Sequence, residues 1–336
     1  MGSVQNIVSI ESPEGRVPEQ GRAPDFFIVG HPKCGTSALY LILRRHPQIY
    51  MPDIKEPRFF AAELRSRFRQ PALDKRPETL DGYRALFAAA GPEQRIGEAS
   101  PIYLMSHAAA GRIAEAQPDA RIIAILREPA SFLRSFHLQC VHNHIETQTD
   151  LRKAIALEGA RREGKRIPRY SHSPQMLMYS ELVRYVEQLR RYHAVFPPEQ
   201  VLVLVYDDFR RDNEATARKV LRFLAVDESH VAPVETDPLA GVRFQRLHHL
   251  TRMAAVASRN PAAAGPVARG VNALISERLR SDATRARWRR LVYREPPPPD
   301  RQLMLELRRR FKGEVVALSD YLGRDLVTQW GYDSVS

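Results

Sequence analysis

A lysine stands inside a glycine-bounded loop in the stretch DFFIVGHPKCGTSALYLILRRHP. Gly30 and Gly35 keep the spacing of the nucleotide-binding pattern G-x-x-x-x-G-K-[ST], in which the lysine follows the second glycine. Here Thr36 occupies that place, and Lys33 lies within the loop instead. The backbone N–H groups of Gly35, Thr36 and Ser37 can converge on an anion where a helix begins, because the helix dipole favours negative charge there. The loop is therefore predicted to bind phosphate, but not a magnesium-bound triphosphate. An ordinary strand-to-helix turn with capping residues is the alternative.

A second pair of polar residues follows another apolar run, in LREPASFLRSF. Arg127 leaves a predicted strand, and Ser135 is expected about two turns into the next helix, facing back toward the end of that strand. Together they could hold a second, separate phosphate. The alternative is a solvated Arg127 beside a helix capped by Ser131.

Strand and helix patterns alternate around these residues. Apolar runs predict strands that end at Gly30, just before Arg127 and at Val205, with helices in TSALYLILRRHP and, after Pro129, in ASFLRSFHLQCVHNH. One long amphipathic helix is predicted over QMLMYSELVRYVEQLRRYHAVF, and a last helix over residues 301–322. Apolar strands separated by helices indicate an α/β fold with a central parallel sheet covered on both faces, which binds ligands at the carboxyl ends of its strands.

Length and composition suit a globular protein of 336 residues with 43% hydrophobic content. Residues 1–24 are expected to form a disordered leader and residues 25–336 a single domain, because the leader mixes Pro, Gly and charge without periodicity. No apolar run reaches the roughly 18 residues that a membrane span needs, and no signal peptide is recognised. With only Cys34 and Cys140, neither a disulfide framework nor a zinc site is expected, and a cytoplasmic location is predicted.

The chain is basic, with a formal net charge of +12. A basic net charge fits nucleic acid, an anionic surface or an anionic ligand, because it indicates only that the partner carries negative charge. His137, His142 and His144 are expected on a helix surface and not in a metal site, because no carboxylate or cysteine pattern completes one.

The ordered motifs together resemble a known family. FIVGHPKCGTSALYLILRRHP and LREPASFLRSF resemble the sulfotransferases that use 3'-phosphoadenosine 5'-phosphosulfate (PAPS), particularly the bacterial members and the glycan N- and O-sulfotransferase branch. The likeness extends through KEPRFF, GEASPIYL, RYVEQLRRYHAVFPPEQVLVLVYDDF and YLGRDLVTQW, and so covers most of the chain from residue 25 onward. It implies the sulfotransferase fold with a P-loop-like phosphate loop, and a transferase that needs no metal.

The resemblance also implies roles for single residues. The loop that grips the 5'-phosphosulfate carries over to Lys33, Cys34, Gly35, Thr36 and Ser37. The grip on the 3'-phosphate carries over to Arg127 and Ser135. Lys33 could then stabilise the negative charge that grows on the oxygen bridging phosphate and sulfate as the sulfuryl group departs.

The resemblance implies Glu56, in MPDIKEPRFF, as the base that removes the acceptor's proton; on the residues alone, a surface carboxylate beside Lys55 is the simpler interpretation. The chain departs from the branch at two places. Arg58 stands where some O-sulfotransferases have histidine, and Ala99 where the branch often has lysine. His31, next to the loop, is a candidate to replace one of them in catalysis.

The implied activity is in-line sulfuryl transfer from PAPS to a hydroxyl, with an amine as the less favoured acceptor group, of a small-molecule natural product, a glycolipid or a carbohydrate. Arg243, Arg246 and Arg252 are further candidates for the 3'-phosphate. The alternatives are a nucleotide kinase or NTPase with a degenerate loop, and a basic nucleic-acid-binding protein. Neither the acceptor nor the oligomeric state can be deduced from the sequence.

Overall fold

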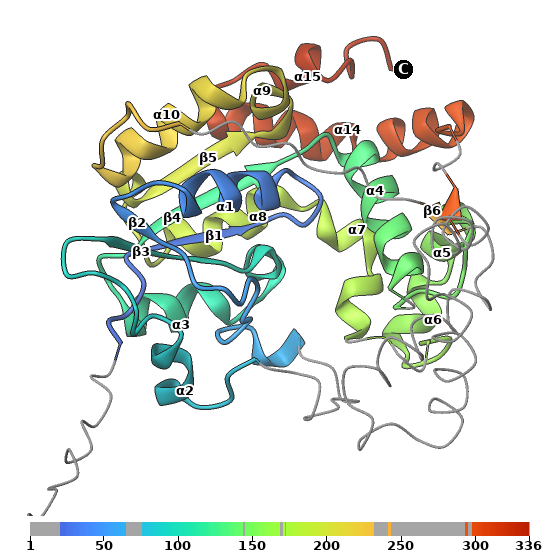
Figure 1. The fold of residues 1–336 in the computed structure, drawn as a ribbon. Coiled ribbons are helices and arrows are strands. Elements are labelled where there is room, and N and C mark those ends of the chain that lie inside the picture. Colours follow the sequence, from blue (N-terminus) through green and yellow to red (C-terminus); the bar gives the residue numbers. More distant parts are fainter. Residues whose placement is uncertain are drawn as a thin grey trace, which may run out of the picture.

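The computed structural model describes residues 21–64, 76–143, 145–168, 171, 173–231, 241–242, 293–294 and 298–335 of the chain. A five-stranded sheet in the order β2-β3-β1-β4-β5 forms its centre, and every neighbouring pair in it is parallel (Figure 1). This confirms the predicted fold class. The strands are β1 Phe26–Gly30, β2 Ile49–Tyr50, β3 Arg95–Ala99, β4 Arg121–Leu126 and β5 Val201–Val205, and a short antiparallel pair is formed by β6 Gly241–Val242 and β7 Tyr293–Arg294.

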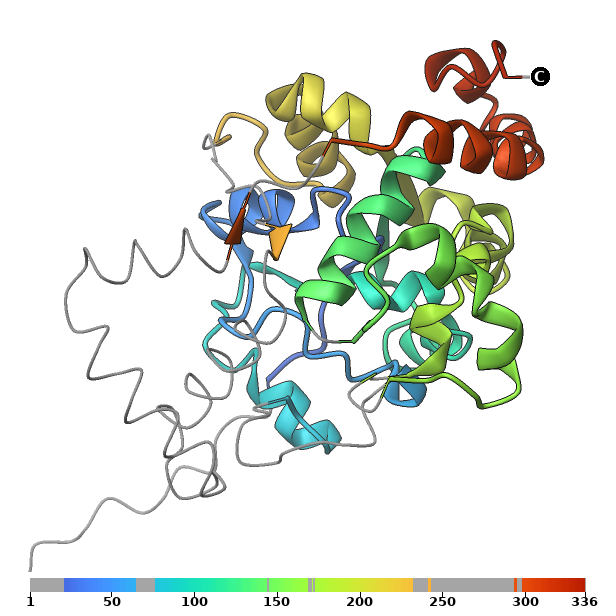
Figure 2. The same cartoon turned by 90° about the vertical axis from the view of Figure 1, so that its right-hand side faces the viewer.

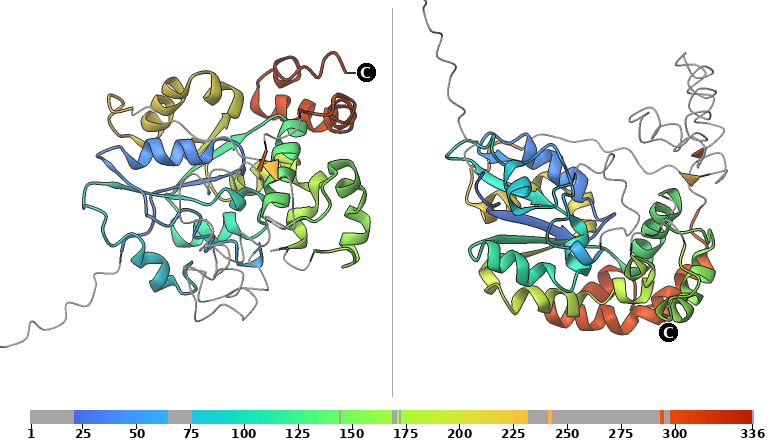
Figure 3. Two further views of the ribbon diagram at one scale, coloured as in Figure 1. Left: turned by 45° about the vertical axis from the view of Figure 1, so that its right-hand side comes forward. Right: turned by 90° about the horizontal axis from the view of Figure 1, so that it is seen from below.

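Helices cover both faces of the sheet, with α1 and α10 on one side and α3 and α8 on the other (Figure 3). The helices are α1 Thr36–Arg44, α2 Leu80–Ala85, α3 Ala109–Ala116, α4 Pro129–His142, α5 Leu151–Ala156, α6 Glu158–Arg162, α7 Tyr179–Leu182, α8 Tyr185–His193, α9 Tyr206–Arg211, α10 Asn213–Leu224, α14 Arg301–Leu322 and α15 Leu326–Gln329. Short 3-10 helices are η1 Ala62–Leu64, η2 Pro101–Met105, η3 Pro174–Leu177 and η4 Pro198–Gln200.

The central strands are apolar because both of their faces are buried. Every residue of β1 is buried, and so is every residue of β4 after its first. The three strands with continuous apolar runs, β1, β4 and β5, were predicted. β2 and β3 were not: β2 has two residues, and β3 carries the polar Glu98 near its end.

The predicted long helix over residues 175–196 is wrong, because the segment is divided into η3, α7 and α8. The side-chain amide of Gln188 donates hydrogen bonds of 3.2 Å to the carbonyl oxygens of both Glu181 and Leu182. In a continuous helix these two carbonyl oxygens would accept backbone N–H groups of the next turn. The Gln188 amide donates to them instead, so the chain can turn between α7 and α8.

A block of short helices stands at the carboxyl-end side of the sheet, where α4 leaves β4 (Figure 2). Its centre is a fully buried ion pair of 2.8 Å between Arg161 and Glu146. The hydroxyl of Tyr179 donates to Glu146, and the Nδ1 atom of His137 lies 3.0 Å from that hydroxyl. The expectation that His137 lies on a helix surface is therefore wrong, since its ring completes a buried polar network. His144 lies outside the described residues.

The last predicted helix is confirmed as α14, which buries a stripe of apolar residues: Leu307, Phe311, Val315 and Leu318. The chain then turns at Gly323 and docks α15 on α9. Arg324 holds the carboxylate of Asp208 with two hydrogen bonds of 2.6 and 2.9 Å, and the indole N–H of Trp330 donates to Asp207 at 2.9 Å. The carboxy-terminal segment thus fixes α9, which borders the candidate site.

Near the amino-terminal end of the described part, Arg22 donates hydrogen bonds to the carbonyl oxygens of Gly91 and Gln94. Residue 22 therefore contacts the connection that precedes β3. The boundary at residue 24 stays a prediction, and residues 1–20 lie outside the described part. No helix within the described ranges combines the length and the apolar character that a membrane crossing requires.

Candidate active site

The predicted phosphate loop connects β1 to α1. Gly35 caps α1 with a left-handed backbone (φ 84°), and a Cβ atom at this position would lie 2.8 Å from the ring of Phe209 in α9. Only glycine fits both demands. Lys33 also has a left-handed backbone (φ 65°), an uncommon conformation for a residue with a side chain. The first-turn N–H groups of α1 have no acceptor within the helix, and Ser37 at that end is exposed.

Two cations face each other at this loop. Arg127, which follows β4, donates a hydrogen bond of 3.0 Å to the carbonyl oxygen of Lys33, and its guanidinium lies 4.7 Å from the ring centre of Tyr206. Within the described part of the chain, no ion pair links either cation to a carboxylate. Burial, and next the charge of Arg127, lower the pKa of Lys33. Two half-buried cations that repel each other form a site for an anion.

A third cation lies near this pair. The pKa of Arg134, on α4, is lowered by burial and then by the charge of Arg127. Ser135, the next residue of α4, is partly exposed. In the described part of the chain, the hydrogen-bond and ring contacts of the Arg127 guanidinium are with the carbonyl oxygen of Lys33 and the ring of Tyr206, and they do not include Ser135. A role for Ser135 at the 3'-phosphate stays a prediction.

The loop that carries Glu56 is fastened to the end of β3. The N–H of Glu56 donates to the carbonyl oxygen of Ala99 at 3.0 Å, and the N–H of Arg58 donates to the hydroxyl of Ser100 at 3.0 Å. Glu56 and Arg58 both have left-handed backbones, with φ 61° and 55°. Such conformations persist only where surrounding contacts fix them, and they gather at functional sites. The backbone oxygen at Ala99, and not its side chain, holds the candidate base.

The strand order β3-β1-β4 brings the predicted groups together. Glu56 is bound to the end of β3, Lys33 follows β1, and Arg127 follows β4. Parallel strands lie about 4.8 Å apart, so the three connections are neighbours along one edge of the sheet. The charge of Lys55 also lowers the pKa of Lys33, which places these two cations within electrostatic reach of each other.

Two cations hold the carboxylate of Glu56. Lys55 donates to its Oε1 atom at 3.0 Å, and Arg58 donates to its Oε2 atom from Nε at 3.2 Å and from Nη2 at 2.5 Å. Burial alone would raise the pKa of Glu56, but the charges and hydrogen bonds of Arg58 and Lys55 outweigh it and lower the pKa to about 2. A cavity of about 330 Å³ opens here, lined by Lys55, Glu56, Arg58 and Arg76.

A second carboxyl group is buried beneath this loop. Glu98 is completely buried and accepts hydrogen bonds from the hydroxyls of Tyr83 (2.8 Å) and Tyr103 (3.0 Å). Burial raises its pKa to about 7, although the tyrosine hydroxyls oppose the shift. The hydroxyl of Tyr103 also accepts the N–H of Phe60 at 3.2 Å, so Glu98 supports the far end of the Glu56 loop.

Three of the predicted site residues are buried, namely His31, Cys34 and Thr36. The imidazole of His31 is fully buried against Phe132, and its Nε2 atom lies 2.6 Å from the side-chain oxygen of Gln188. Burial lowers the pKa of His31 to about 4, so the ring is neutral near pH 7. The buried thiol of Cys34 has a pKa raised to about 12 by burial. Cys34 can therefore offer its backbone to a ligand, and a catalytic role for His31 stays a prediction that its placement does not favour.

Sequence reasoning missed Lys55 as a site residue, as well as Arg134, Tyr206 and Glu98. Tyr206 could have been found, because it directly follows a predicted strand at the same edge as Arg127. Glu98 gave no such signal, since β3 was not recognised. Arg243, Arg246 and Arg252 lie outside the described residues. No three metal-ligating side chains come together in the ranges that the structure describes.

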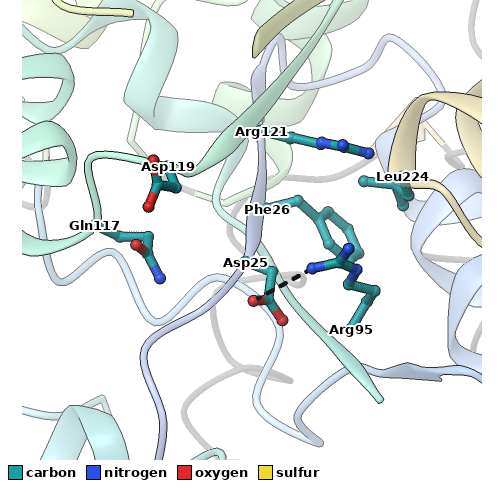
Figure 4. Close-up of a pocket in the computed structure, with 7 residues that line it drawn as sticks. All are labelled: Asp25, Phe26, Arg95, Gln117, Asp119, Arg121 and Leu224. Atoms are coloured by element: carbon teal, nitrogen blue, oxygen red, sulfur yellow. Dashed lines mark ion pairs between the residues drawn. The ribbon is translucent and has the colours of Figure 1, made fainter. Parts of the chain in front are cut away.

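Another cavity, of about 250 Å³, lies at the opposite edge of the sheet (Figure 4). Asp25, Arg95 and Arg121 at the beginnings of β1, β3 and β4 line it, with Phe26, Gln117, Asp119 and Leu224. Ligands of open parallel sheets bind at the carboxyl ends of the strands, and this cavity lies at the amino ends. It is therefore separate from the site of Lys33, Glu56 and Arg127.

Comparison with known proteins agrees with this geometry. A sulfotransferase from Alicyclobacillus acidocaldarius has a similar structure, with a TM-score of 0.56 and 31% identity, over 70% of this chain and 94% of that one. Human carbohydrate sulfotransferase 15 is 26% identical over 269 residues, which are 66% of this chain and 47% of that protein. The human bifunctional heparan sulfate N-deacetylase/N-sulfotransferase 3 is 28% identical over 211 residues, 61% of this chain and 22% of that protein.

The chain thus matches less than half of the length of these two human relatives. The family model described as the sulfotransferase family matches residues 24–230, which are more than half of the chain and include the phosphate loop, the Glu56 loop and Arg127. The chain belongs to the sulfotransferase family.

Proposed function

We propose that the protein transfers a sulfuryl group from PAPS to a hydroxyl, or with less preference an amine, of a small-molecule natural product, a glycolipid or a carbohydrate. The observation that carries this proposal is the row of Glu56, Lys33 and Arg127 along one edge of the sheet. The loop of Lys33 lies between the carboxylate of Glu56 and the cation of Arg127. A donor with two separate phosphates would use the two cations, and an acceptor hydroxyl would use the carboxylate.

The residues present fit such a donor. Lys33 and Arg127 are cations without a carboxylate partner in the described chain, and they repel each other until an anion joins them. PAPS supplies the activated sulfuryl group together with phosphates at its 5' and 3' positions. The 5' side would be held by Lys33 and the backbone of residues 34–37, and the 3'-phosphate by Arg127, Arg134 and Ser135.

Glu56 is proposed as the general base that receives the acceptor's proton. It lies one strand from Lys33, on a loop whose conformation is fixed by hydrogen bonds to Ala99 and Ser100. Lys33 would stabilise the charge on the departing oxygen. Sulfuryl transfer then needs positioning and charge stabilisation, and the chain need not form a covalent intermediate.

The nucleotide kinase alternative requires a carboxylate for magnesium near the phosphate loop. Arg127 follows β4, and the two carboxylates after β5 are already bound, Asp207 to Trp330 and Asp208 to Arg324. These contacts favour the transferase. The expectation that the protein binds no nucleic acid stays a prediction.

The class of acceptor is proposed from the relatives. Their names describe carbohydrate and heparan sulfate sulfotransferases, which favours a sugar hydroxyl or amine among the three acceptor classes. A role in natural-product or glycoconjugate tailoring, and a cytoplasmic location, are part of the proposal on the basis of the sequence alone.

The test is a transfer assay with PAPS and a panel of glycosides, amino sugars and phenols. Formation of adenosine 3',5'-bisphosphate that depends on an acceptor, together with a sulfated product seen by mass spectrometry, is expected. The Lys33→Ala variant should lose this activity. Absence of product with every acceptor, in a protein that does not bind adenosine 3',5'-bisphosphate, would overturn the proposal.

A further inference from the structure

The carboxylate proposed as the base is occupied by Arg58. The guanidinium donates twice to Oε2 of Glu56, while Lys55 occupies Oε1. The side chains of Lys55, Arg58 and Glu56 are 22%, 20% and 30% exposed, so solvent screens these contacts only in part. Both oxygens of the carboxylate are thus engaged by cations.

A carboxylate held in this way is a poor base. Its pKa is about 2, far from the neutral range in which general bases work best. In the described part of the chain, the charged groups around it are Lys55 and Arg58 on its own loop, Arg76 across the cavity, and Glu98 beneath it on β3. Among these, Arg58 lowers the pKa most. If Arg58 moved away, the burial of Glu56 would raise its pKa again.

The charges of the cavity beside Glu56 favour an incoming anion that could draw Arg58 away from Glu56. Among the described residues that line it, Lys55, Arg58 and Arg76 are cationic and Glu56 carries a carboxylate. A carboxylate or sulfate group entering this cavity could form the same two-pronged contact with Arg58 that Glu56 now forms. The anion would then compete with Glu56 for the guanidinium.

We propose that Arg58 is a specificity-determining residue: it binds an anionic group, a carboxylate or a sulfate, that the acceptor carries beside its reactive hydroxyl, and in doing so releases Glu56 to act as the base. Neutral acceptors leave Arg58 on Glu56 and react slowly. This inference rests on the proposed function and adds the acceptor's charge to it.

The proposed transfer step moves one proton, forms one bond to sulfur and breaks another. The acceptor hydroxyl gives its proton to an oxygen of Glu56, and the acceptor oxygen forms the new bond to sulfur. The bond between sulfur and the bridging oxygen breaks, and its electron pair stays on the phosphate side, where Lys33 lies. Arg58 contributes by leaving Glu56 and by holding the acceptor's anionic group.

The experiment compares matched acceptors that differ in charge, such as methyl β-glucoside with methyl β-glucuronide and a phenol with its carboxyphenol. In each pair that the wild type sulfates, the kcat/KM for the anionic acceptor should be at least about tenfold higher than that for the neutral acceptor. The Arg58→Gln variant should lose this preference and should turn over the neutral member faster than the wild type does. Arg218→Gln, which removes an exposed arginine paired with Glu214 on α10, is the matched control and should keep the preference.

A second measurement does not depend on finding a good acceptor. NMR titration of the Glu56 carboxyl group should show its pKa rising from about 2 toward 4.5 in Arg58→Gln, and also in the wild type when methyl β-glucuronide, but not methyl β-glucoside, is added. An unchanged pKa in the variant, or equal kcat/KM for both members of the reacting pairs, would overturn the inference. If no acceptor reacts, the titration with methyl β-glucuronide decides, and an unmoved pKa rejects it. Failure to bind adenosine 3',5'-bisphosphate would instead count against the proposed function.

Discussion

Arg127 donates a hydrogen bond of 3.0 Å to the carbonyl oxygen of Lys33 and so ties the end of β4 to the loop after β1. The stacking of Arg127 on Tyr206 adds β5 to this connection. One side chain therefore joins three neighbouring strand ends and leaves its positive charge without a carboxylate partner in the described chain. An anion bound by Arg127 would therefore lie beside a loop that the same side chain holds in place.

The first prediction concerns the 3'-phosphate. Arg127→Ala should weaken the binding of adenosine 3',5'-bisphosphate by roughly 10- to 100-fold, the equivalent of a charged hydrogen bond. Binding of adenosine 5'-monophosphate should weaken much less, because that nucleotide has no phosphate at the 3' position. Calorimetry on the variant and on Arg218→Ala, an exposed control, measures both. Equal weakening for the two nucleotides would mean that Arg127 only supports the loop.

The second prediction concerns the base. Glu56→Gln should lower kcat by about 10²- to 10⁴-fold, because the amide cannot accept the acceptor's proton. Binding of adenosine 3',5'-bisphosphate should stay as in the wild type, since Glu56 is proposed to contact the acceptor and not the nucleotide. Glu187→Gln, on the exposed part of α8, is the control with full activity. Undiminished turnover in Glu56→Gln would remove Glu56 from the mechanism.

Candidate site residues could be named from the sequence where a motif carried them, and their roles stay predictions. Lys33, Arg127 and Glu56 were named from short motifs, and the sheet brings these three to one edge. The partners of these residues could not be predicted in the same way. That Arg58 grips Glu56 depends on left-handed backbone angles at both residues and on hydrogen bonds to the end of β3, a strand that the sequence pattern did not reveal.

The third prediction concerns the loop itself. Gly35→Ala should destabilise the protein by roughly 1–3 kcal/mol and abolish nucleotide binding, because the new methyl group meets Phe209 and the backbone angle is strained. Gly111→Ala is the matched control: this glycine lies in α3 with open space around its missing side chain, and alanine should stabilise the helix by about 0.5–1 kcal/mol. Urea denaturation measures both variants. An unchanged stability in Gly35→Ala contradicts the fit described for this loop.

The fourth prediction concerns Glu98. Its pKa of about 7 in the folded protein lies above the 4.5 of an ordinary glutamate, so the folded state binds this proton more tightly. The stability that the protonated group contributes is complete below pH 4.5 and is lost as the pH rises through 7, at roughly 1.4 kcal/mol per pH unit.

Urea denaturation of the wild type and of Glu98→Gln at about pH 5 and about pH 8 tests this relation. The wild type should lose stability relative to the variant between the two values, since glutamine keeps an acceptor for Tyr83 and Tyr103 and does not ionise. A stability difference that stays the same at both values would show that Glu98 titrates like an exposed carboxyl group.

The helical parts show why sequence reasoning ends where tertiary contacts begin. α14 was predicted with its observed limits, because its apolar stripe and its Asp300 and Gly323 caps lie within the segment itself. The break between α7 and α8 was not predicted, because it depends on the amide of Gln188, whose oxygen lies 2.6 Å from the ring of His31, the residue after β1. A bond between residues 157 positions apart leaves no local pattern.

The most direct test of the central claim is a calorimetric titration with adenosine 3',5'-bisphosphate, compared with ADP and ATP, each with and without magnesium. The anion site built by Lys33 and Arg127 predicts tight binding of the bisphosphate that is indifferent to magnesium and stronger than that of either other nucleotide. Preference for ATP with magnesium, or no binding of any nucleotide, would contradict the assignment of this edge of the sheet to a sulfuryl donor.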